Sequence, residues 1–187
     1  MATTPLETAH PELRTRQDVA RHYLGDLVYG ANDGIITTFA VVAGVAGAAL
    51  PARVLIVLGL ANLVADGFSM AASNFLAIRS RGAVERAEGR PVSEPFAVKH
   101  GLATLAAFVL AGAVPLLTFV TGVTPALRFP VATGLTLVAL FAVGAARVTV
   151  TGGRWWTNGL EMLAVGAAAA GVAYAIGRLL AGVGMAG

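Results

Sequence analysis

Five long apolar stretches, separated by short polar segments, dominate the pattern of this chain of 187 residues. A helix needs about 20 mostly apolar residues to cross a bilayer, and isolated strands cannot satisfy their backbone groups in lipid. The pattern therefore predicts an all-α fold, an integral membrane protein with five transmembrane helices. Their approximate ranges are Leu24–Leu50, Val54–Ile78, Val98–Thr121, Phe129–Val150 and Thr157–Leu180, and Pro115 is expected to interrupt the third.

Two polar segments lie outside these spans. Residues 1–23 lack the apolar run of a signal peptide and form the expected cytoplasmic N-terminal segment. Weak helical spacing over Thr8–Tyr23 favours a short surface helix there. Residues 24–187 form the predicted five-helix transmembrane domain, with residues 80–97 as a short cytoplasmic loop. In that loop we expect Glu85, Glu88 and Glu94 to be solvated charges balanced by neighbouring arginines.

Composition supports the membrane assignment. The chain is 57% hydrophobic and 12% charged, whereas soluble domains carry about 25% charged residues. The absence of cysteine excludes disulfides and thiolate metal sites. The formal net charge of +3 arises from residues in the loops, so we interpret it as a topology signal and expect no nucleic-acid partner.

Lysine and arginine predict the orientation, because cytoplasmic loops are enriched in them. Ten of the thirteen fall on one side of the predicted spans, which makes the N terminus cytoplasmic and puts the C terminus on the opposite side. Richness in Ala, Gly and Arg favours a bacterial inner membrane. The ten are Arg14, Arg16, Arg21, Arg79, Arg81, Arg86, Arg90, Lys99, Arg147 and Arg154.

Acidic residues interrupt the first two apolar stretches. Asp26 and Asp33 are seven residues apart on the first helix, so their carboxylates share a face and lie about 10 Å apart along the axis. A charged residue at the bilayer centre costs roughly 2.5–3.5 kcal/mol, and such residues usually mark ion or proton paths.

The second helix carries a polar stripe at steps of four residues, made of Asn62, Asp66, Met70 and Asn74, with Ser69 and Ser73 in the adjacent row. Counted from the cytoplasmic ends of their spans, Asp33 rises about 13.5 Å and Met70 about 12 Å. The two residues are therefore expected at nearly one depth, with Asp66 one turn deeper.

This set of donors favours a divalent cation. Carboxylate and amide oxygens suit hard or borderline ions, and a thioether shifts the preference toward a transition metal such as Fe(II). The carboxylates can also exchange protons. Glu161, at the start of the fifth span, is either a charge favoured by the helix dipole or a further residue of the ion path. The alternative for the whole set is a buried polar network that only ties helices together.

At these residues the chain resembles the vacuolar iron transporter family. The matching blocks are residues 26–47, 59–77 and 158–163. The resemblance implies a homodimer that exports Fe(II), and as a further candidate Mn(II), from the cytosol in exchange for protons. We expect no permanent cofactor, and Co(II) and Zn(II) are further candidates for the transported ion. It assigns metal binding to Asp26, Asp33 and Met70.

One departure from the family is large. Many members carry a glutamate-rich cytoplasmic helical domain between spans two and three, where this chain has the eighteen residues Ser80–Ala97. A packed domain needs roughly 40 residues. The chain therefore resembles the shorter, nodulin-like branch.

Two other functions compete with metal transport. In an intramembrane aspartyl protease, Asp33 and Asp66 would share a proton, although their contexts, Ala-Asn-Asp-Gly and Val-Ala-Asp-Gly, differ from the patterns of such enzymes. In a non-transporting accessory protein, the polar stripe would only hold a dimer together. For the dimer we expect close packing along Gly30, Gly34, Gly44 and Gly47 of the first helix.

Overall fold

The computed structural model describes residues 16–94 and 96–183, and five helices in this part of the chain are long and apolar enough to cross a membrane. The all-α, five-span prediction is confirmed. The first half of the expected surface helix, and Arg14, lie outside the described residues. The elements are α1 (Arg16–Gly47), α2 (Ala52–Ala87), α3 (Ala97–Gly112), η1 (Val114–Leu116), α4 (Leu117–Val120), α5 (Pro125–Ala146), α6 (Val148–Thr151) and α7 (Trp155–Val183).

The third span is broken as expected. Its helix α3 ends at Gly112, and Pro115 lies in the short 3₁₀ helix η1 before α4 continues the span. Proline has no N–H to donate to the preceding turn, and its ring clashes with the carbonyl there. The break therefore follows directly from the position of Pro115.

Both α1 and α2 are longer than the sequence pattern predicted. Helix α1 begins at Arg16, so residues 16–23 of the expected surface helix are continuous with the first span, and α2 continues to Ala87 instead of Ile78, so residues 80–87 of the predicted loop are helical. The extension is rich in alanine, arginine and glutamate, which favour helices even in water. Helix α2 stops where Gly89 adopts a φ of 70° and the Arg90 N–H donates to the Glu85 carbonyl.

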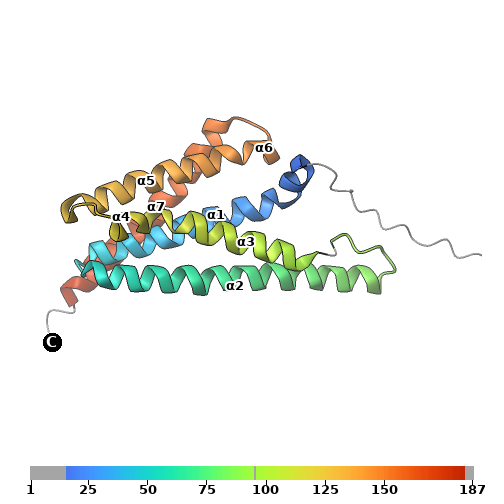
Figure 1. The fold of residues 1–187 in the computed structure, drawn as a ribbon, viewed down its shortest axis with the longest axis horizontal. Coiled ribbons are helices and arrows are strands. Elements are labelled where there is room, and N and C mark those ends of the chain that lie inside the picture. The colour runs from blue at the N-terminus through green and yellow to red at the C-terminus, as the bar shows by residue number, and fades with distance from the viewer. Residues whose placement is uncertain (1–15, 95, 184–187) are drawn as a thin grey trace, which may run out of the picture.

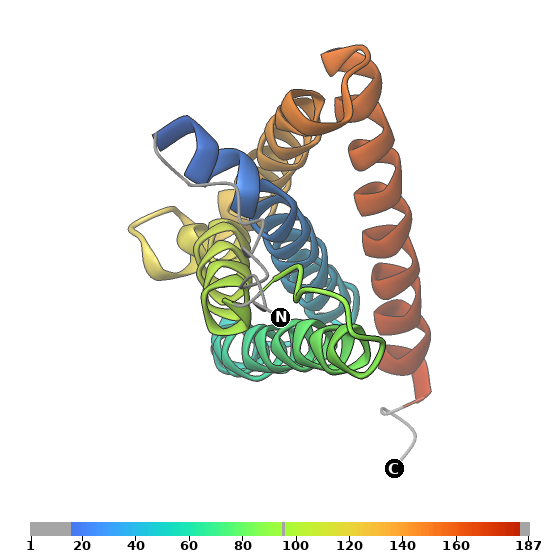
Figure 2. The same cartoon turned by 90° about the vertical axis from the view of Figure 1, so that its right-hand side faces the viewer.

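Helix α1 is the centre of the bundle. It contacts α2, α3, α5 and α7, while α2 packs on α3 and α5 pairs with α7. Figure 1 shows α1, α2 and α3 running side by side, and Figure 2 shows α2 and α7 at the margins of the bundle. The apolar core lies where these helices meet and includes Phe39 and Val42 of α1, Leu63 of α2, Phe108 of α3 and Ala170 of α7.

The glycines of α1 let two neighbours approach closely within the protomer. A Cβ added at Gly30 or Gly34 would overlap carbonyl oxygens of α3, and one added at Gly47 would overlap a carbonyl of α7. Three of the four glycines expected at a dimer interface therefore pack against helices of the same chain.

Candidate functional site

Asp26, the first of the predicted acidic residues, joins three helices. Its Oδ1 accepts a hydrogen bond from Asn74 Nδ2 of α2 at 2.7 Å, and Asn74 Nδ2 also donates to Thr104 Oγ1 of α3 at 2.9 Å. Thr104 is fully buried and donates in turn to the His100 carbonyl. The two predicted site residues, Asp26 and Asn74, are thus brought together at the end of the bundle where α1 begins.

The other Asp26 oxygen meets a residue that the sequence analysis missed. His100 Nδ1 lies 2.5 Å from Asp26 Oδ2, and the His100 side chain is 8% exposed. A usable signal was present, since His100 and Thr104 are polar, four residues apart and therefore on one face of an otherwise apolar helix.

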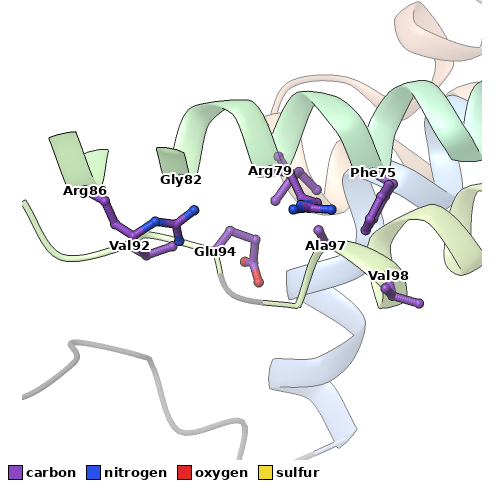
Figure 3. A pocket seen from close by; sticks show the side chains of 9 residues that line it. Phe75, Arg79, Gly82, Arg86, Val92, Glu94, Ala97 and Val98 are labelled. Carbon is purple, nitrogen blue, oxygen red and sulfur yellow. The ribbon is translucent and has the colours of Figure 1, made fainter. Parts of the chain in front are cut away.

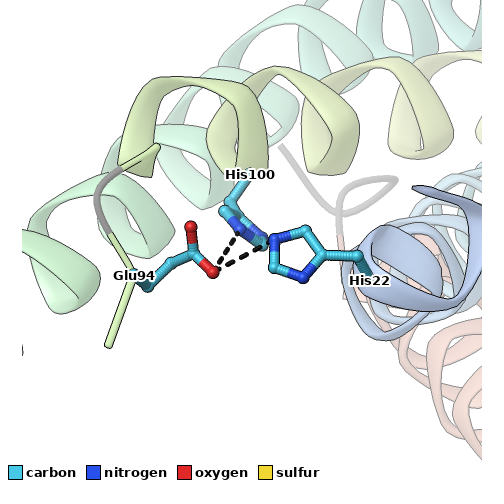
Figure 4. Close-up of side chains that lie close together, drawn as sticks. All are labelled: His22, Glu94 and His100. Carbon is cyan, nitrogen blue, oxygen red and sulfur yellow. Dashed lines mark ion pairs between the residues drawn. The ribbon is translucent and has the colours of Figure 1, made fainter. Parts of the chain in front are cut away.

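Three side chains form a compact group beside Asp26, which we call the His–Glu cluster and define as His22, Glu94 and His100 (Figure 4). His22 Nε2 lies 3.1 Å from Glu94 Oε2, and His100 Nε2 lies 3.3 Å from the same oxygen. Tyr23 packs against both imidazole rings. Glu94 is therefore not the solvated charge that the sequence suggested.

Glu85 also differs from that expectation. It is 7% exposed, and its carboxylate accepts hydrogen bonds from the Ser93 N–H at 2.8 Å and the Ser93 hydroxyl at 2.6 Å. Among the three glutamates, Glu88 behaves as expected, because it is exposed and pairs with Arg90. The connection after α2 is therefore folded back against the helix.

A cavity of about 390 Å³ opens between the end of α2 and this connection (Figure 3). Its walls include Phe75, Arg79 and Arg86 of α2, and Glu94 from the connection. One wall of the cavity thus belongs to a member of the His–Glu cluster.

Asp33 and Asp66 form a second acidic group, farther along the same helices. Gly34 of α1 and Gly67 of α2 both approach Phe108 of α3, so the two helices are level there. Asp33 precedes Gly34 and Asp66 precedes Gly67, and both aspartates are half-buried. Asp66 therefore lies near the level of Asp33, and a shared depth of Asp33 and Met70 stays a prediction.

The remaining predicted residues of α2 lie on either side of this pair. Met70 is half-buried and packs against the apolar core. Asn62 Nδ2 is buried without a hydrogen-bond partner among the described residues, as is Oδ1 of Asn32, the neighbour of Asp33. Buried polar atoms are normally satisfied by protein, water or an ion. Water or a cation can satisfy the Asn32 oxygen, whereas the Asn62 Nδ2 group is a donor and needs an acceptor such as water.

Glu161 is separate from both acidic groups. It lies near the start of α7 with its side chain 64% exposed, and its carboxylate lies 3.4 Å from Arg147 Nη1. The structure thus joins Glu161 to the end of α5 and not to the polar residues of α1 and α2.

Comparison with known proteins shows where related chains match. The model of the VIT family matches residues 24–94 and 89–178, and these two stretches meet in the connection between α2 and α3. Vacuolar iron transporter homolog 5 of Oryza sativa subsp. japonica is 29% identical over 167 residues, which span 84% of this chain and 80% of the relative.

Two further rice proteins are similar over most of their length. Vacuolar iron transporter homolog 1 is 30% identical over 175 residues, with 86% of this chain and 75% of the relative aligned. Vacuolar iron transporter 1 is 23% identical over 226 aligned positions, with 90% of this chain and 88% of the relative covered.

Proposed function

The chain belongs to the VIT family, and from that premise we propose that it carries Fe(II) across the membrane through the acidic residues of α1 and α2. Its relatives are named as iron transporters, so the protein is a transporter and not an enzyme. The protease hypothesis for Asp33 and Asp66 is therefore set aside.

The observation that carries the proposal is the Asp33–Asp66 pair. The two carboxylates lie at one level of neighbouring membrane helices, and carboxylates that share a site repel each other unless a proton or a cation lies between them. Such a pair is costly in a membrane and is typical of ion paths. We assign it the central cation site.

The other predicted residues extend this site into a path. Asp26 and Asn74 supply oxygens toward the end where α1 begins, and Asn62 supplies an amide beyond Asp66. Met70 contributes its thioether between these levels, which favours Fe(II) over harder ions. Glu161 stays a weaker candidate, because its observed partner is Arg147.

We further propose that metal movement is coupled to protons. Asp33 and Asp66 bind either a cation or protons, so an opposing proton gradient can drive the metal out of the cytosol. Mn(II), Co(II) and Zn(II) are secondary substrates, because the same oxygen ligands accept them with different affinities.

A second copy of the chain is the proposed partner. Ser69 and Ser73 are exposed on α2, a helix at the margin of the bundle (Figure 2). Polar residues of membrane helices usually face protein or water and not lipid. A homodimer in which α2 faces its counterpart would cover this row. Gly30, Gly34 and Gly47 of α1, in contrast, already pack against α3 and α7 of the same chain.

The orientation is proposed from charge alone. The positive residues near the start of α1 and the end of α2 support a cytoplasmic N terminus, and five spans then put the C terminus on the opposite side. A bacterial inner membrane fits the composition. Because the chain has no cysteine, single cysteines introduced at either end and labelled from one side can test this arrangement.

Flux into proteoliposomes tests the function. Purified protein should admit Fe(II), acidification of the opposite compartment should accelerate the flux, and Asp33→Asn should abolish it. Metal flux without any proton movement would reject the coupling and keep the metal path. Absence of flux for Fe(II), Mn(II), Co(II) and Zn(II) by folded protein would favour the accessory-protein alternative.

A further inference from the structure

We propose that the His–Glu cluster is a second metal site, which binds a divalent transition-metal ion through His22 Nε2, His100 Nε2 and a Glu94 oxygen. The three residues come from the start of α1, the start of α3 and the connection before it. The proposed path of Asp33 and Asp66 does not include them.

The spacing of the donor atoms suits one shared ion. Glu94 Oε2 lies 3.1 Å from His22 Nε2 and 3.3 Å from His100 Nε2, and all three ligand atoms lie within 4.8 Å of one another. Ligands about 2.1 Å from a tetrahedral ion are roughly 3.4 Å apart. The two distances to Glu94 Oε2 thus match this spacing, and the remaining separation, between the two histidine nitrogens, is at most 4.8 Å.

The protons of the cluster also favour a cation. With its Nδ1–H donated to Asp26, a neutral His100 presents only a lone pair at Nε2. That atom is buried and faces the Glu94 carboxylate at 3.3 Å without forming a hydrogen bond to it. A lone pair facing a carboxylate is unfavourable, and either a proton on Nε2 or a metal ion bound by both atoms removes the conflict.

Asp26 provides the outer support that metal-binding histidines usually have. A ligating imidazole commonly donates its other N–H to a carboxylate, which fixes the ring and makes the nitrogen a better ligand. Here that carboxylate is itself held by Asn74, which is anchored to Thr104. The orientation of His100 is thus set by three helices before any metal arrives.

The donor set defines the class of ion. Two imidazoles and one carboxylate suit Fe(II), Co(II) and Zn(II), whereas Mg(II) and Ca(II) prefer oxygen ligands. Three protein ligands leave coordination positions for water, which permits exchange. The cavity beside Glu94 adjoins the cluster, and Arg79 and Arg86 in its walls weaken cation binding by repulsion.

The cluster lies at the end of the path and shares Asp26 with it. This position fits a site that receives the ion before it moves to Asp33 and Asp66. This role rests on the proposed transport function, whereas the binding itself does not.

Equilibrium binding to the purified full chain tests the proposal without requiring transport. Co(II) is the probe, because its visible absorption reports nitrogen ligands and coordination number. The wild-type protein should show a nitrogen-ligated Co(II) site. His22→Gln and Glu94→Gln should abolish that signal, and Asp26→Asn should weaken Co(II) affinity about 10- to 100-fold, as expected for loss of an outer-shell carboxylate.

Matched controls separate the cluster from other sites. Glu88→Gln changes a glutamate of the same connection, and His10→Gln changes the third histidine of the chain; both should keep the signal. Asp33→Asn should keep it too, while losing transport. Thermal unfolding checks that each variant is folded.

Two results would overturn the inference. One is a wild-type protein without nitrogen-ligated Co(II), and the other is a signal that survives in folded His22→Gln and Glu94→Gln. If Co(II) binds as expected but no metal crosses proteoliposomes, the metal site stands and the transport proposal fails.

Discussion

At the scale of single residues, the Asp26 carboxylate uses its two oxygens on two helices. Oδ1 accepts from Asn74 of α2, and Oδ2 meets His100 of α3. A hydrogen bond to a charged group stabilises the folded state by about 1.5–3 kcal/mol, more than a bond between neutral groups. The contact of Asn74 with Asp26 therefore helps to hold α1, α2 and α3 together in addition to any role in metal binding.

Asn74→Ala tests this contact. The variant should lose about 1–3 kcal/mol of unfolding free energy, because Asp26 and Thr104 both lose a donor. Ser80→Ala, at an exposed position of the same helix, should change stability by no more than about 0.5 kcal/mol. Unfolding in denaturing detergent measures both, and equal effects would contradict the assigned bond.

Asp33 and Met70 can be separated by two conservative substitutions. Asp33→Asn keeps the shape and removes the charge, so folding should survive while Fe(II) flux falls at least about tenfold. Met70→Leu preserves volume and should cost less than about 1.5 kcal/mol of stability. As a ligand, Met70 should affect Fe(II), Co(II) and Zn(II) more than Mn(II). Equal flux of all four metals in Met70→Leu would make Met70 a core residue only.

The sequence predicted the acidic residues and one partner of Asp26, Asn74, but not its second partner, His100. Asp26, Asp33, Asp66 and Asn74 follow from periodicity within one helix, because polar residues at steps of four or seven share a face. His100 is 74 positions from Asp26, and such a pairing depends on how α3 docks on α1. No periodicity within a single helix contains that information.

At the scale of helices, close contact between backbones organises the bundle around α1. Gly34 lies against the Phe108 carbonyl of α3, and Gly177 of α7 lies against the Gly44 carbonyl of α1. Small residues permit such approaches between membrane helices. The sequence indicated that these glycines pack, but a single helix does not reveal whether its neighbour belongs to the same chain.

Gly34→Ala should disrupt the contact between α1 and α3. The added methyl group overlaps backbone atoms that cannot rotate away, so we expect a loss of about 1–3 kcal/mol. Gly134→Ala is the control, because Gly134 is exposed on α5 with open space around it. That variant should gain about 0.5–1 kcal/mol from reduced backbone freedom in the unfolded state. Similar thermal stability of the two variants would contradict the packing described for α1.

The end of α2 is fastened by the contact of Glu85 with Ser93. Glu85→Ala removes both hydrogen bonds, so amide hydrogen exchange in residues 88–94 should accelerate. Glu88→Ala, which removes only the exposed pair with Arg90, should leave that exchange nearly unchanged. Equal protection in both variants would show that Glu85 does not hold the connection.

At the scale of the whole molecule, the five spans could be predicted because apolar length alone decides whether a helix crosses the bilayer. The end of α2 could not be predicted, because residues 79–87 are mostly polar yet helical. Hydropathy reports where a helix leaves lipid, whereas helix propensity and tertiary contacts decide where it stops.

The proposed homodimer makes a prediction at this scale. A single cysteine at Ser69 or Ser73, in a chain that has none, should cross-link two copies in native membranes through the exposed row of α2. A cysteine at Val138, exposed on α5, should not. Monomers only, or equal cross-linking at Val138, would contradict an interface on α2.

The length of α2 has a consequence for how chains of this architecture can grow. Its 36 residues extend about 54 Å, whereas the hydrocarbon core of a bilayer is about 30 Å thick. The end of the helix therefore places the turn at Gly89 outside the hydrocarbon core, and no other residue approaches that glycine. Chain inserted there would meet water and not the spanning helices, and longer surface loops add little entropic cost. A soluble domain inserted at the Gly89 turn would therefore leave the packing of the membrane-spanning helices unchanged.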